Sequence, residues 1–274
     1  NKKQRQNFSL STALLKKKKK MFDRIKYKEK ALAQLKGQWK VFTIVSAISA
    51  ALLMLVKMPE IISKASNHFP FMENIFHAES VSPIYGSGVI LFFMFCALQN
   101  AAIFLSLKLA VEGTKVSLKD FFKGLEGFWK AFQAGFWMIV FITPWIILIC
   151  FPMLLISAIF VLLLVPLVIL FFVPVIVKFY SYSMTFFVLN EYPELGVLKS
   201  MKISKIMTKG YKGELFSMTL SFSGWIFLSL ITGGIGFIFL APYLNLAFTN
   251  AYLELKTIAL KSATLLQEDF ESKK

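Results

Sequence analysis

The stretch Ala131–Val177 reads AFQAGFWMIVFITPWIILICFPMLLISAIFVLLLVPLVILFFVPVIV and contains 47 consecutive residues without a charge. A helix needs about 20 apolar residues to cross the hydrocarbon of a bilayer, so this run is long enough for two helices. Proline disfavours helix in the residue before it, which places the predicted reversal at Phe151–Pro152. The stretch therefore predicts a pair of membrane-spanning helices.

Three further uncharged runs flank this pair: Val41–Val56, Ser80–Leu107 and Leu215–Leu253. Ser80–Leu107 holds one helix. Val41–Val56 is short for a span, but Trp39 and Lys40 can extend it at one end, and Lys57 can snorkel at the other. The third has 39 residues and fits two helices hinged at Gly233–Gly236, because glycine permits a tight turn. The fold class predicted is an all-α, polytopic membrane bundle of six transmembrane helices. The composition agrees, since only 17% of residues are charged, against roughly 25% in ordinary globular proteins.

The charged residues predict the orientation of this bundle. Segments 1–40, 108–130, 178–214 and 254–274 carry 14, 5, 6 and 4 lysines and arginines, whereas segment 57–87 carries 2. Cytoplasmic loops of membrane proteins are enriched in these residues, so both ends of the chain are predicted to lie in the cytoplasm. Basic cytoplasmic loops also explain the net charge of +16, which otherwise suggests a nucleic-acid partner.

The chain divides into four predicted parts: a basic, disordered leader (1–20), an amphipathic cytoplasmic helix (21–39), the six-helix transmembrane domain (40–256) and a polar cytoplasmic tail (257–274). One face of the amphipathic helix would lie on the membrane surface or cap the bundle. That face consists of Met21, Ile25, Leu32, Leu35 and Trp39. The five lysines at 16–20 fit three interpretations: a contact with anionic lipid, a solvated tail, or a translated ribosome-binding site preceding a true start at Met21.

The sequence offers little that could carry catalysis. It has no nucleotide-binding glycine loop, no zinc-binding helix motif and no serine nucleophile elbow. Cys96 and Cys150 lie in apolar runs and predict packed thiols, while His68 and His77 lack the spacing of metal ligands. We therefore expect no enzyme activity and no cofactor.

Amide side chains lie at depth in two of the predicted spans: Gln99 and Asn100 in the second, and Asn245 and Asn250 in the sixth. Amides in lipid need hydrogen-bonding partners, typically contributing about 0.6 kcal/mol per bond. Their positions predict a polar clamp between the second and sixth helices, with a substrate site as the alternative.

The segment 195–212 is a second amphipathic candidate. Its basic face predicts contacts with anionic lipid head groups at the cytoplasmic surface. That face consists of Lys199, Lys202, Lys205, Lys209 and Lys212.

A series of short motifs between residues 30 and 256 resembles a family of bacterial predicted integral membrane proteins, domain of unknown function 975. The densest match is Leu220-Ser221-Phe222-Ser223-Gly224-Trp225. Other matching motifs include Leu35-Lys36-Gly37-Gln38-Trp39, Val116-Ser117-Leu118-Lys119-Asp120, Asn190-Glu191-Tyr192-Pro193 and Ala241-Pro242-Tyr243. The resemblance implies a multi-pass bacterial membrane protein and supplies no activity. Val175 departs from the family pattern, which usually has glycine after the proline at this point.

The function expected from these features is a non-enzymatic structural or accessory role in the bacterial cytoplasmic membrane, with the lipid bilayer as partner. The alternative is a transport component, either a small permease or the membrane subunit of an ATPase-driven transporter. A cavity open to one side and lined by the amides would favour transport, and a closed bundle would favour the accessory role.

Overall fold

The computed structural model describes residues 22–66, 83–157, 164–262 and 264–270, and within these ranges the regular secondary structure is helical throughout. The helices follow one another in chain order without an intervening strand. They are α2 (Arg24–Leu35), α3 (Trp39–Ser66), α5 (Pro83–Glu112), α6 (Leu118–Leu125), α7 (Phe128–Ser157), α8 (Leu164–Tyr182), α9 (Thr185–Glu191), η2 (Pro193–Leu195), α10 (Val197–Met207), α11 (Lys212–Leu220), α12 (Ser223–Ile231), α13 (Phe237–Lys261) and η3 (Gln267–Phe270).

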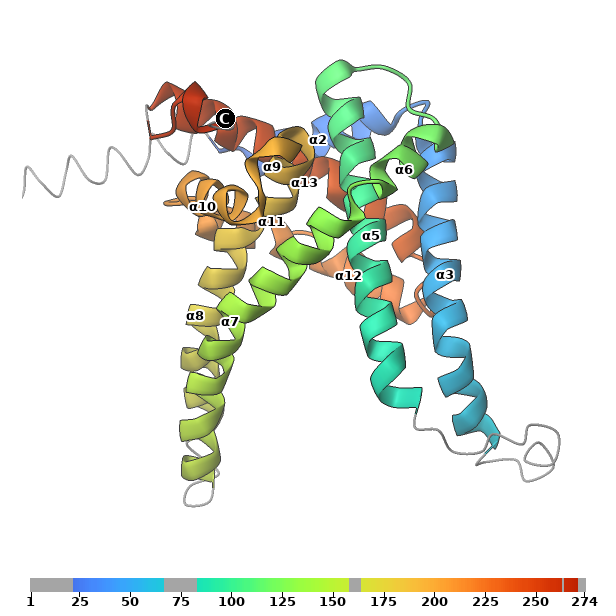
Figure 1. Ribbon diagram of the computed structural model, residues 1–274, viewed down its shortest axis with the longest axis vertical. Coiled ribbons are helices and arrows are strands. Elements are labelled where there is room, and N and C mark those ends of the chain that lie inside the picture. Colours follow the sequence, from blue (N-terminus) through green and yellow to red (C-terminus); the bar gives the residue numbers. More distant parts are fainter. Residues whose placement is uncertain (1–21, 67–82, 158–163, 263, 271–274) are drawn as a thin grey trace, which may run out of the picture.

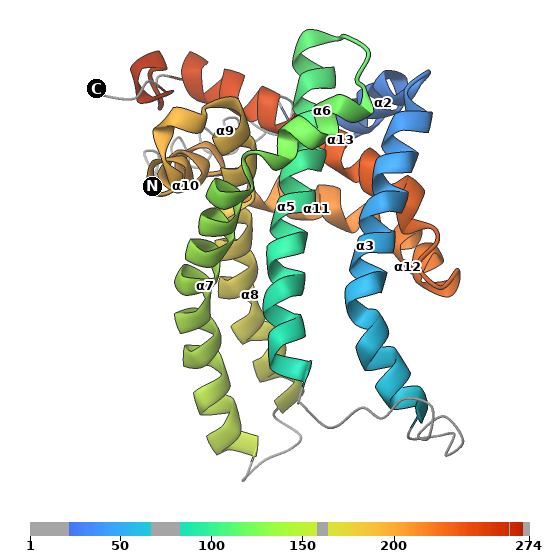
Figure 2. The same ribbon diagram turned by 45° about the vertical axis from the view of Figure 1, so that its right-hand side comes forward.

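The long helices form two legs (Figures 1 and 2). One leg is the pair α3 and α5, and the other is the pair α7 and α8. The legs meet at one end of the molecule, where α7 approaches α5 and the short helices α6, α9 and α10 gather. α13 runs obliquely behind α5 to this same end.

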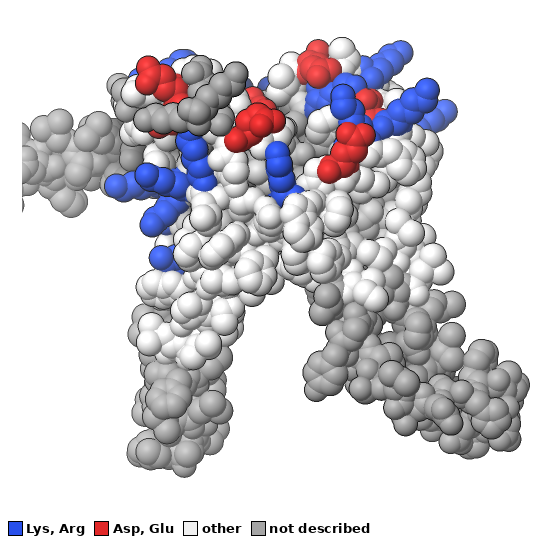
Figure 3. Space-filling view, viewed as in Figure 1, with Lys and Arg blue, Asp and Glu red and all other residues white. Residues whose placement is uncertain are grey.

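Among the side chains that the structure describes, charge gathers at the end where the legs meet, which carries α2, α6, α9, α10 and the last turns of α13. Figure 3 shows lysine, arginine, aspartate and glutamate side chains over this charged end and uncharged residues along the described parts of both legs. Large apolar side chains on the legs face outward, such as Phe136, Ile147 and Leu148, which are 50%, 61% and 64% exposed. An apolar exterior of this extent is stable in lipid.

Four helical segments are long and apolar enough to cross a membrane: Ile90–Glu112, Phe128–Leu148, Phe172–Glu191 and Lys212–Ile231. A fifth is obtained if α2 and the first part of α3, which meet at 98°, count as one bent span. The chain is thus an all-helical protein with several helices suited to a bilayer. The pair α12 and α13 runs obliquely to the legs. The turn that joins these two helices therefore lies closer to the charged end than the far ends of the legs do (Figures 1 and 2).

The predicted reversal at Phe151–Pro152 is wrong, because α7 continues through these residues to Ser157. The next helix begins at Leu164, and residues 158–163 between the two helices are outside the described part of the chain. Lipid offers the backbone no alternative hydrogen-bonding partner, so a helix persists through proline there more readily than in water.

The second predicted reversal lies where expected. Gly233 and Gly234 form the turn between α12 and α13 with φ of +64° and +92°, and the Gly234 N–H donates to the Ser229 carbonyl at 2.9 Å. Both glycines adopt the left-handed conformation that residues with a Cβ rarely enter.

The helix predicted over 21–39 is divided at a turn over 36–38, after which Trp39 begins α3. Gly37, with φ of +84°, supplies the left-handed residue that ends α2. Of the predicted apolar face, Leu35 is fully buried, whereas Ile25 and Leu32 are 61% and 42% exposed. Helix α2 packs against α13 and lies across the end of the bundle (Figure 1).

The segment predicted as a polar tail begins inside α13, which extends to Lys261. Beyond it, residues 264–270 fold back on the bundle and bury Leu265 and Phe270, which are 2% and 4% exposed. The ring of Phe270 lies 5.0 Å from that of Tyr192.

Candidate functional site

A polar network surrounds the C-terminal end of α9 at the charged end of the molecule. Asn190, Glu191 and Tyr192 are consecutive, and each bonds a different part of the structure. We call this network, with Asn100, Tyr252 and Lys256, the α9 hub.

The first branch of the hub joins three helices through two asparagines. Asn100 on α5 is 4% exposed, and its amide donates to the Gly124 carbonyl on α6 at 2.9 Å. The amide of Asn190 donates to the Asn100 carbonyl oxygen at 2.6 Å and to the Phe186 carbonyl at 2.8 Å. Both hydrogen-bonding ends of Asn100 are satisfied, so this branch fixes α5, α6 and α9 relative to one another.

The second branch is an ion pair with a tyrosine on either side. Lys256 donates to Glu191 at 2.6 Å, and the hydroxyl of the fully buried Tyr252 donates to the other Glu191 carboxylate oxygen at 2.5 Å. Lys256 also donates to the Tyr192 hydroxyl at 2.5 Å and lies over the Phe270 ring at 5.6 Å. The side chains of Lys256 and Glu191 are 16% and 21% exposed, so the pair is largely shielded from solvent.

Pro193 extends the network to α7, because its carbonyl accepts from the Lys130 ammonium at 2.8 Å. Four successive residues, 190–193, thereby connect α9 with α5, α7 and α13. Each oxygen of the Glu191 carboxylate accepts from one donor on α13, which suits the group to holding helices together.

The other two clamp residues, Gln99 and Asn245, line a cleft between the legs with a volume of about 630 Å³. Figure 3 shows a hollow beneath the charged end at this place. The walls come mainly from α5, α7, α8 and α13, and Phe186 and Phe187 of α9 close the end next to the hub. Gln99 and Asn245 also line a smaller pocket of about 190 Å³ on the α3 side, so their side chains separate two cavities.

Within the described residues, neither the Gln99 nor the Asn245 side chain forms a hydrogen bond, to the other or to a third residue. Placing an amide in an apolar surrounding without a partner costs roughly 1–3 kcal/mol. The cleft thus contains two polar groups that the described protein leaves unsatisfied.

Asn250 lies further along α13 and is 2% exposed. Its amide donates to Gln34 on α2 at 2.8 Å and to the Leu246 carbonyl at 3.0 Å. The predicted set of four therefore divides: Asn100 bonds α6 and α9, Asn250 bonds α2, and only Gln99 and Asn245 share a space. Adjacent helical positions point about 100° apart, which separates Gln99 from Asn100.

The predicted basic face lies along α10 and the start of α11. Lys202, Lys205 and Lys209 are exposed, and Lys199 and Lys212 are half-buried. The opposite face of α10 packs on α8, where the Ser204 hydroxyl donates to the Ser181 carbonyl at 2.9 Å. The lysines are consequently held outward at the charged end by a fixed helix.

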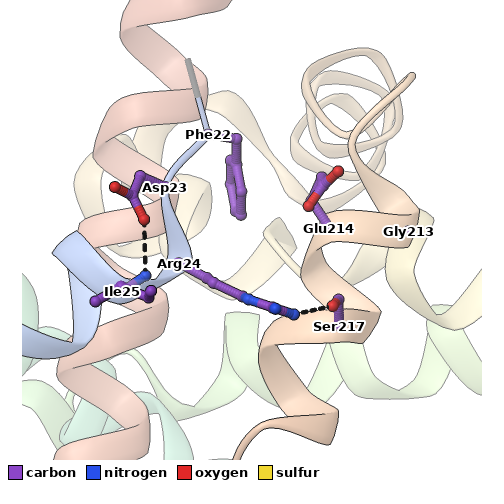
Figure 4. A pocket seen from close by; sticks show the side chains of 7 residues that line it. All are labelled: Phe22, Asp23, Arg24, Ile25, Gly213, Glu214 and Ser217. Carbon is purple, nitrogen blue, oxygen red and sulfur yellow. Dashed lines mark hydrogen bonds between the residues drawn. The ribbon is translucent and has the colours of Figure 1, made fainter. Parts of the chain in front are cut away.

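A third cavity, of about 410 Å³, lies at the surface between the start of α2 and α11 (Figure 4). Arg24 donates to the Ser217 hydroxyl, and the Asp23 carboxylate caps α2 by accepting from the Ile25 N–H at 3.0 Å. Nearby, Lys28 donates to the Ser221 carbonyl at 3.0 Å and lies over the Phe222 ring at 3.9 Å. These contacts anchor α2 to α11 and its following turn.

A family model described as "Protein of unknown function (DUF975)" matches residues 21–259, which is most of the chain. The chain belongs to this family. No curated protein and no solved structure matches it.

The α9 hub contains residues that sequence reasoning about this DUF975 chain did not assign. In the sequence, Lys256 counts only as one of the basic residues that predict the orientation, and Glu191 stands only within the family motif Asn190-Glu191-Tyr192-Pro193. A carboxylate between an asparagine and a tyrosine, directly after an apolar helix, was the available signal. Its partners on α13 lie 61 and 65 residues away and depend on the fold.

Proposed function

We propose that this DUF975 protein is a non-enzymatic structural or accessory component of the bacterial cytoplasmic membrane, with both chain ends in the cytoplasm. The proposed six passes are α3, α5, α7, α8, α11 with α12, and α13. The observation that carries the proposal is that the described charged side chains gather at one end, whereas the described side chains of the legs are largely apolar and many are exposed (Figure 3). The positive-inside rule favours placing that end in the cytoplasm.

The proposed partner at the cytoplasmic face is anionic lipid, and no nucleic acid is proposed. Exposed lysines on α10 lie at the end where lipid head groups would be, and each basic residue near such a surface contributes about 1 kcal/mol. The exposed Ile25 and Leu32 of α2 would enter the head-group layer from a helix that lies nearly perpendicular to α3.

A non-enzymatic role is supported by the hydrogen bonds that engage the titratable side chains of the α9 hub. Tyr252 and Lys256 of α13 both donate to Glu191 of α9, which suits these groups to fixing the bundle. Catalysis requires a titratable group free to meet a substrate.

The second candidate function is a transport component, and the cleft between the legs favours it. A cavity open to one side and lined by Gln99 and Asn245 is the feature that distinguishes a translocation site from a closed bundle. Asn100 does not line that cavity.

Reporter fusions test the topology. A fusion at His68, which lies outside the described residues, is expected outside the cytoplasm, and a fusion after Lys256 inside it. Finding both on one side would overturn the proposed arrangement.

Purification of the full chain in mild detergent, followed by identification of co-purifying proteins, tests the role. Co-purification with other membrane proteins supports the accessory function. A reproducible ATPase partner would replace it with the transport function.

Lipid contact has its own measurement. Vesicles containing phosphatidylglycerol and vesicles of phosphatidylcholine alone are compared for protection of Lys202, Lys205 and Lys209 from amine modification in the reconstituted protein. Protection is expected only with the anionic lipid, and equal modification in both would contradict the contact.

A further inference from the structure

We propose that the cleft between the legs is a binding site for a neutral lipid, meaning a long apolar chain with one uncharged hydroxyl or carbonyl end. The polar end lies between Gln99 and Asn245, and the chain lies along α7 and α8. This inference goes beyond the accessory role, because it assigns a ligand whether or not the bundle moves it.

The walls of the cleft match the apolar part of such a molecule. Phe92 and Phe95 of α5 line the space together with Met138, Ile139 and Ile142 of α7. The volume of about 630 Å³ is within the range of roughly 300–1,000 Å³ that ligand pockets occupy. The cleft lies between the legs, at a depth of the membrane where the surrounding solvent is hydrocarbon.

The inner wall of the cleft explains why the ligand needs a polar end. Gln99 lies near the middle of the span Ile90–Glu112, and Asn245 lies on the helix that crosses behind it. Both amides lack a partner within the described residues, and each offers donors and an acceptor. A hydroxyl or carbonyl between them would satisfy both, which a pure hydrocarbon cannot do.

The charge of the lining explains why that end is neutral. The residues that form the cleft include no lysine, arginine, aspartate or glutamate, and the Tyr180 hydroxyl is occupied by a bond to Thr219 at 2.8 Å. An ionised head group would be buried here without a counter-charge, which is strongly unfavourable. Phospholipid head groups are therefore excluded from the inner wall, in contrast to the lysine-rich charged end.

The test uses the full chain reconstituted in phosphatidylcholine vesicles and hexadecanol carrying a photoreactive diazirine on its chain. Palmitic acid with the same diazirine, ionised at neutral pH, is the matched charged probe. After irradiation, peptide mass spectrometry locates the adducts. The alcohol is expected to label Met138 and Ile142, which line the cleft, more than Phe136 and Ile147, which do not, and the acid is expected to show no such preference.

The double variant Gln99→Leu/Asn245→Leu removes both amides and is expected to lower cleft labelling by the alcohol about fivefold, as for the loss of one net hydrogen bond. Gln133→Leu is the matched control, because Gln133 lies in a spanning segment and is not part of the cleft wall. It is expected to label like the natural sequence.

A variant that fills the space provides a second, independent readout. Ile142→Trp leaves both amides in place and is expected to reduce labelling of the cleft if the chain of the probe lies there. Every variant must elute as a monodisperse peak from size-exclusion chromatography in detergent. If the double amide variant does not fold, the labelling of Ile142→Trp tests the proposal by itself.

Three results would overturn the proposal: equal labelling of the cleft-lining and the other positions, equal labelling by alcohol and acid, or labelling unaffected by the variants. Intermolecular crosslinking of an Ile139→Cys variant would do the same, because it would show that a second copy of the chain fills the cleft.

Discussion

Gln99 and Asn100 are neighbours on α5, yet their amides lie in opposite surroundings. Asn100 points into the α9 hub, where a carbonyl on α6 and an amide on α9 satisfy it. Gln99 points into the cleft, where the described chain gives it no partner. The difference teaches that an amide in a membrane helix has two uses. A satisfied amide joins helices, and an unsatisfied one marks a place where another molecule can bind.

Helix α9 lies between the hub and the cleft and contributes residues to both. Asn190 and Glu191 bond the hub, whereas Phe186 and Phe187 close the end of the cleft. A rigid hub beside an open cleft predicts that stability depends on the first region and ligand binding on the second.

The largest expected effect is from Glu191→Gln. The change removes the carboxylate that pairs with Lys256 and accepts from Tyr252, leaving a largely buried ammonium without its counter-charge. We expect a loss of about 2–3 kcal/mol in the free energy of unfolding, less than the 3–5 kcal/mol of a fully buried pair. Denaturant unfolding in detergent measures it. The control Glu194→Gln, at an exposed position, should change little, and equal effects of the two variants would contradict the assigned role.

Alanine at the two neighbouring amides gives the next effect. Asn100→Ala leaves the Gly124 carbonyl and the Asn190 amide short of a partner and should cost roughly 1–3 kcal/mol. Gln99→Ala removes an amide that bonds nothing in the described chain and should stay within about 0.5 kcal/mol. The same unfolding measurement compares them. A larger loss from Gln99→Ala would show that the cleft amide is structural.

Two glycines extend the comparison to backbone packing. At Gly124, beside the hub, a Cβ would meet the Cα of Ala101 at 2.8 Å, so Gly124→Ala must move helix α6 away from α5. We expect a loss of about 1–3 kcal/mol. At Gly135, beside the cleft, the nearest atoms are the Cys96 Sγ at 2.9 Å and the end of the Phe92 ring at 3.1 Å.

Those side-chain ends can turn into the cleft, so Gly135→Ala should cost less than about 1 kcal/mol. Thermal unfolding of both variants in one detergent provides the comparison. The reverse order of the two losses would mean that the cleft is packed more tightly than the hub.

The smallest effect is acid sensitivity at Asp120, at the charged end. Hydrogen bonds from the Lys108 ammonium at 2.5 Å and from the Ser117 N–H at 2.8 Å hold the pKa of this carboxyl below its ordinary value. A lowered folded-state pKa contributes stability above the unfolded value of about 4 and loses it as the pH falls below that value.

Thermal unfolding of Asp120→Asn and the natural sequence should therefore differ slightly at pH 7 and less at pH 3. The exposed Glu126→Gln is the control. A difference that stays constant between the two pH values would show that the carboxylate does not act through its charge.

Much of this architecture followed from the order of residues. The 47 uncharged residues of Ala131–Val177 required helices, because lipid offers a chain no other way to satisfy its backbone. Gly233 and Gly234 marked a turn that the structure contains. The prediction of a reversal near Pro152 was wrong. The tendency of one proline to interrupt a helix is weaker than the need of the neighbouring backbone groups for helical hydrogen bonds.

The candidate sites were only partly visible in sequence. Uncharged polar residues stand out within the apolar runs, yet the sequence does not give their partners. Asn100 bonds Gly124 and Asn190, and Asn250 bonds Gln34, 216 positions away in the chain. Such pairings depend on how helices cross, which hydropathy and charge do not encode.

The sequence by itself determined that the chain is helical, that long parts of it are suited to lipid, and that charge lies outside those parts, because hydrophobicity and charge are properties of each residue. Only the tertiary structure decided that Glu191 meets Tyr252 and Lys256, and that Gln99 and Asn245 share a cleft. Hydrogen bonds are short and directional, so an amide one position further along a helix meets a different neighbour.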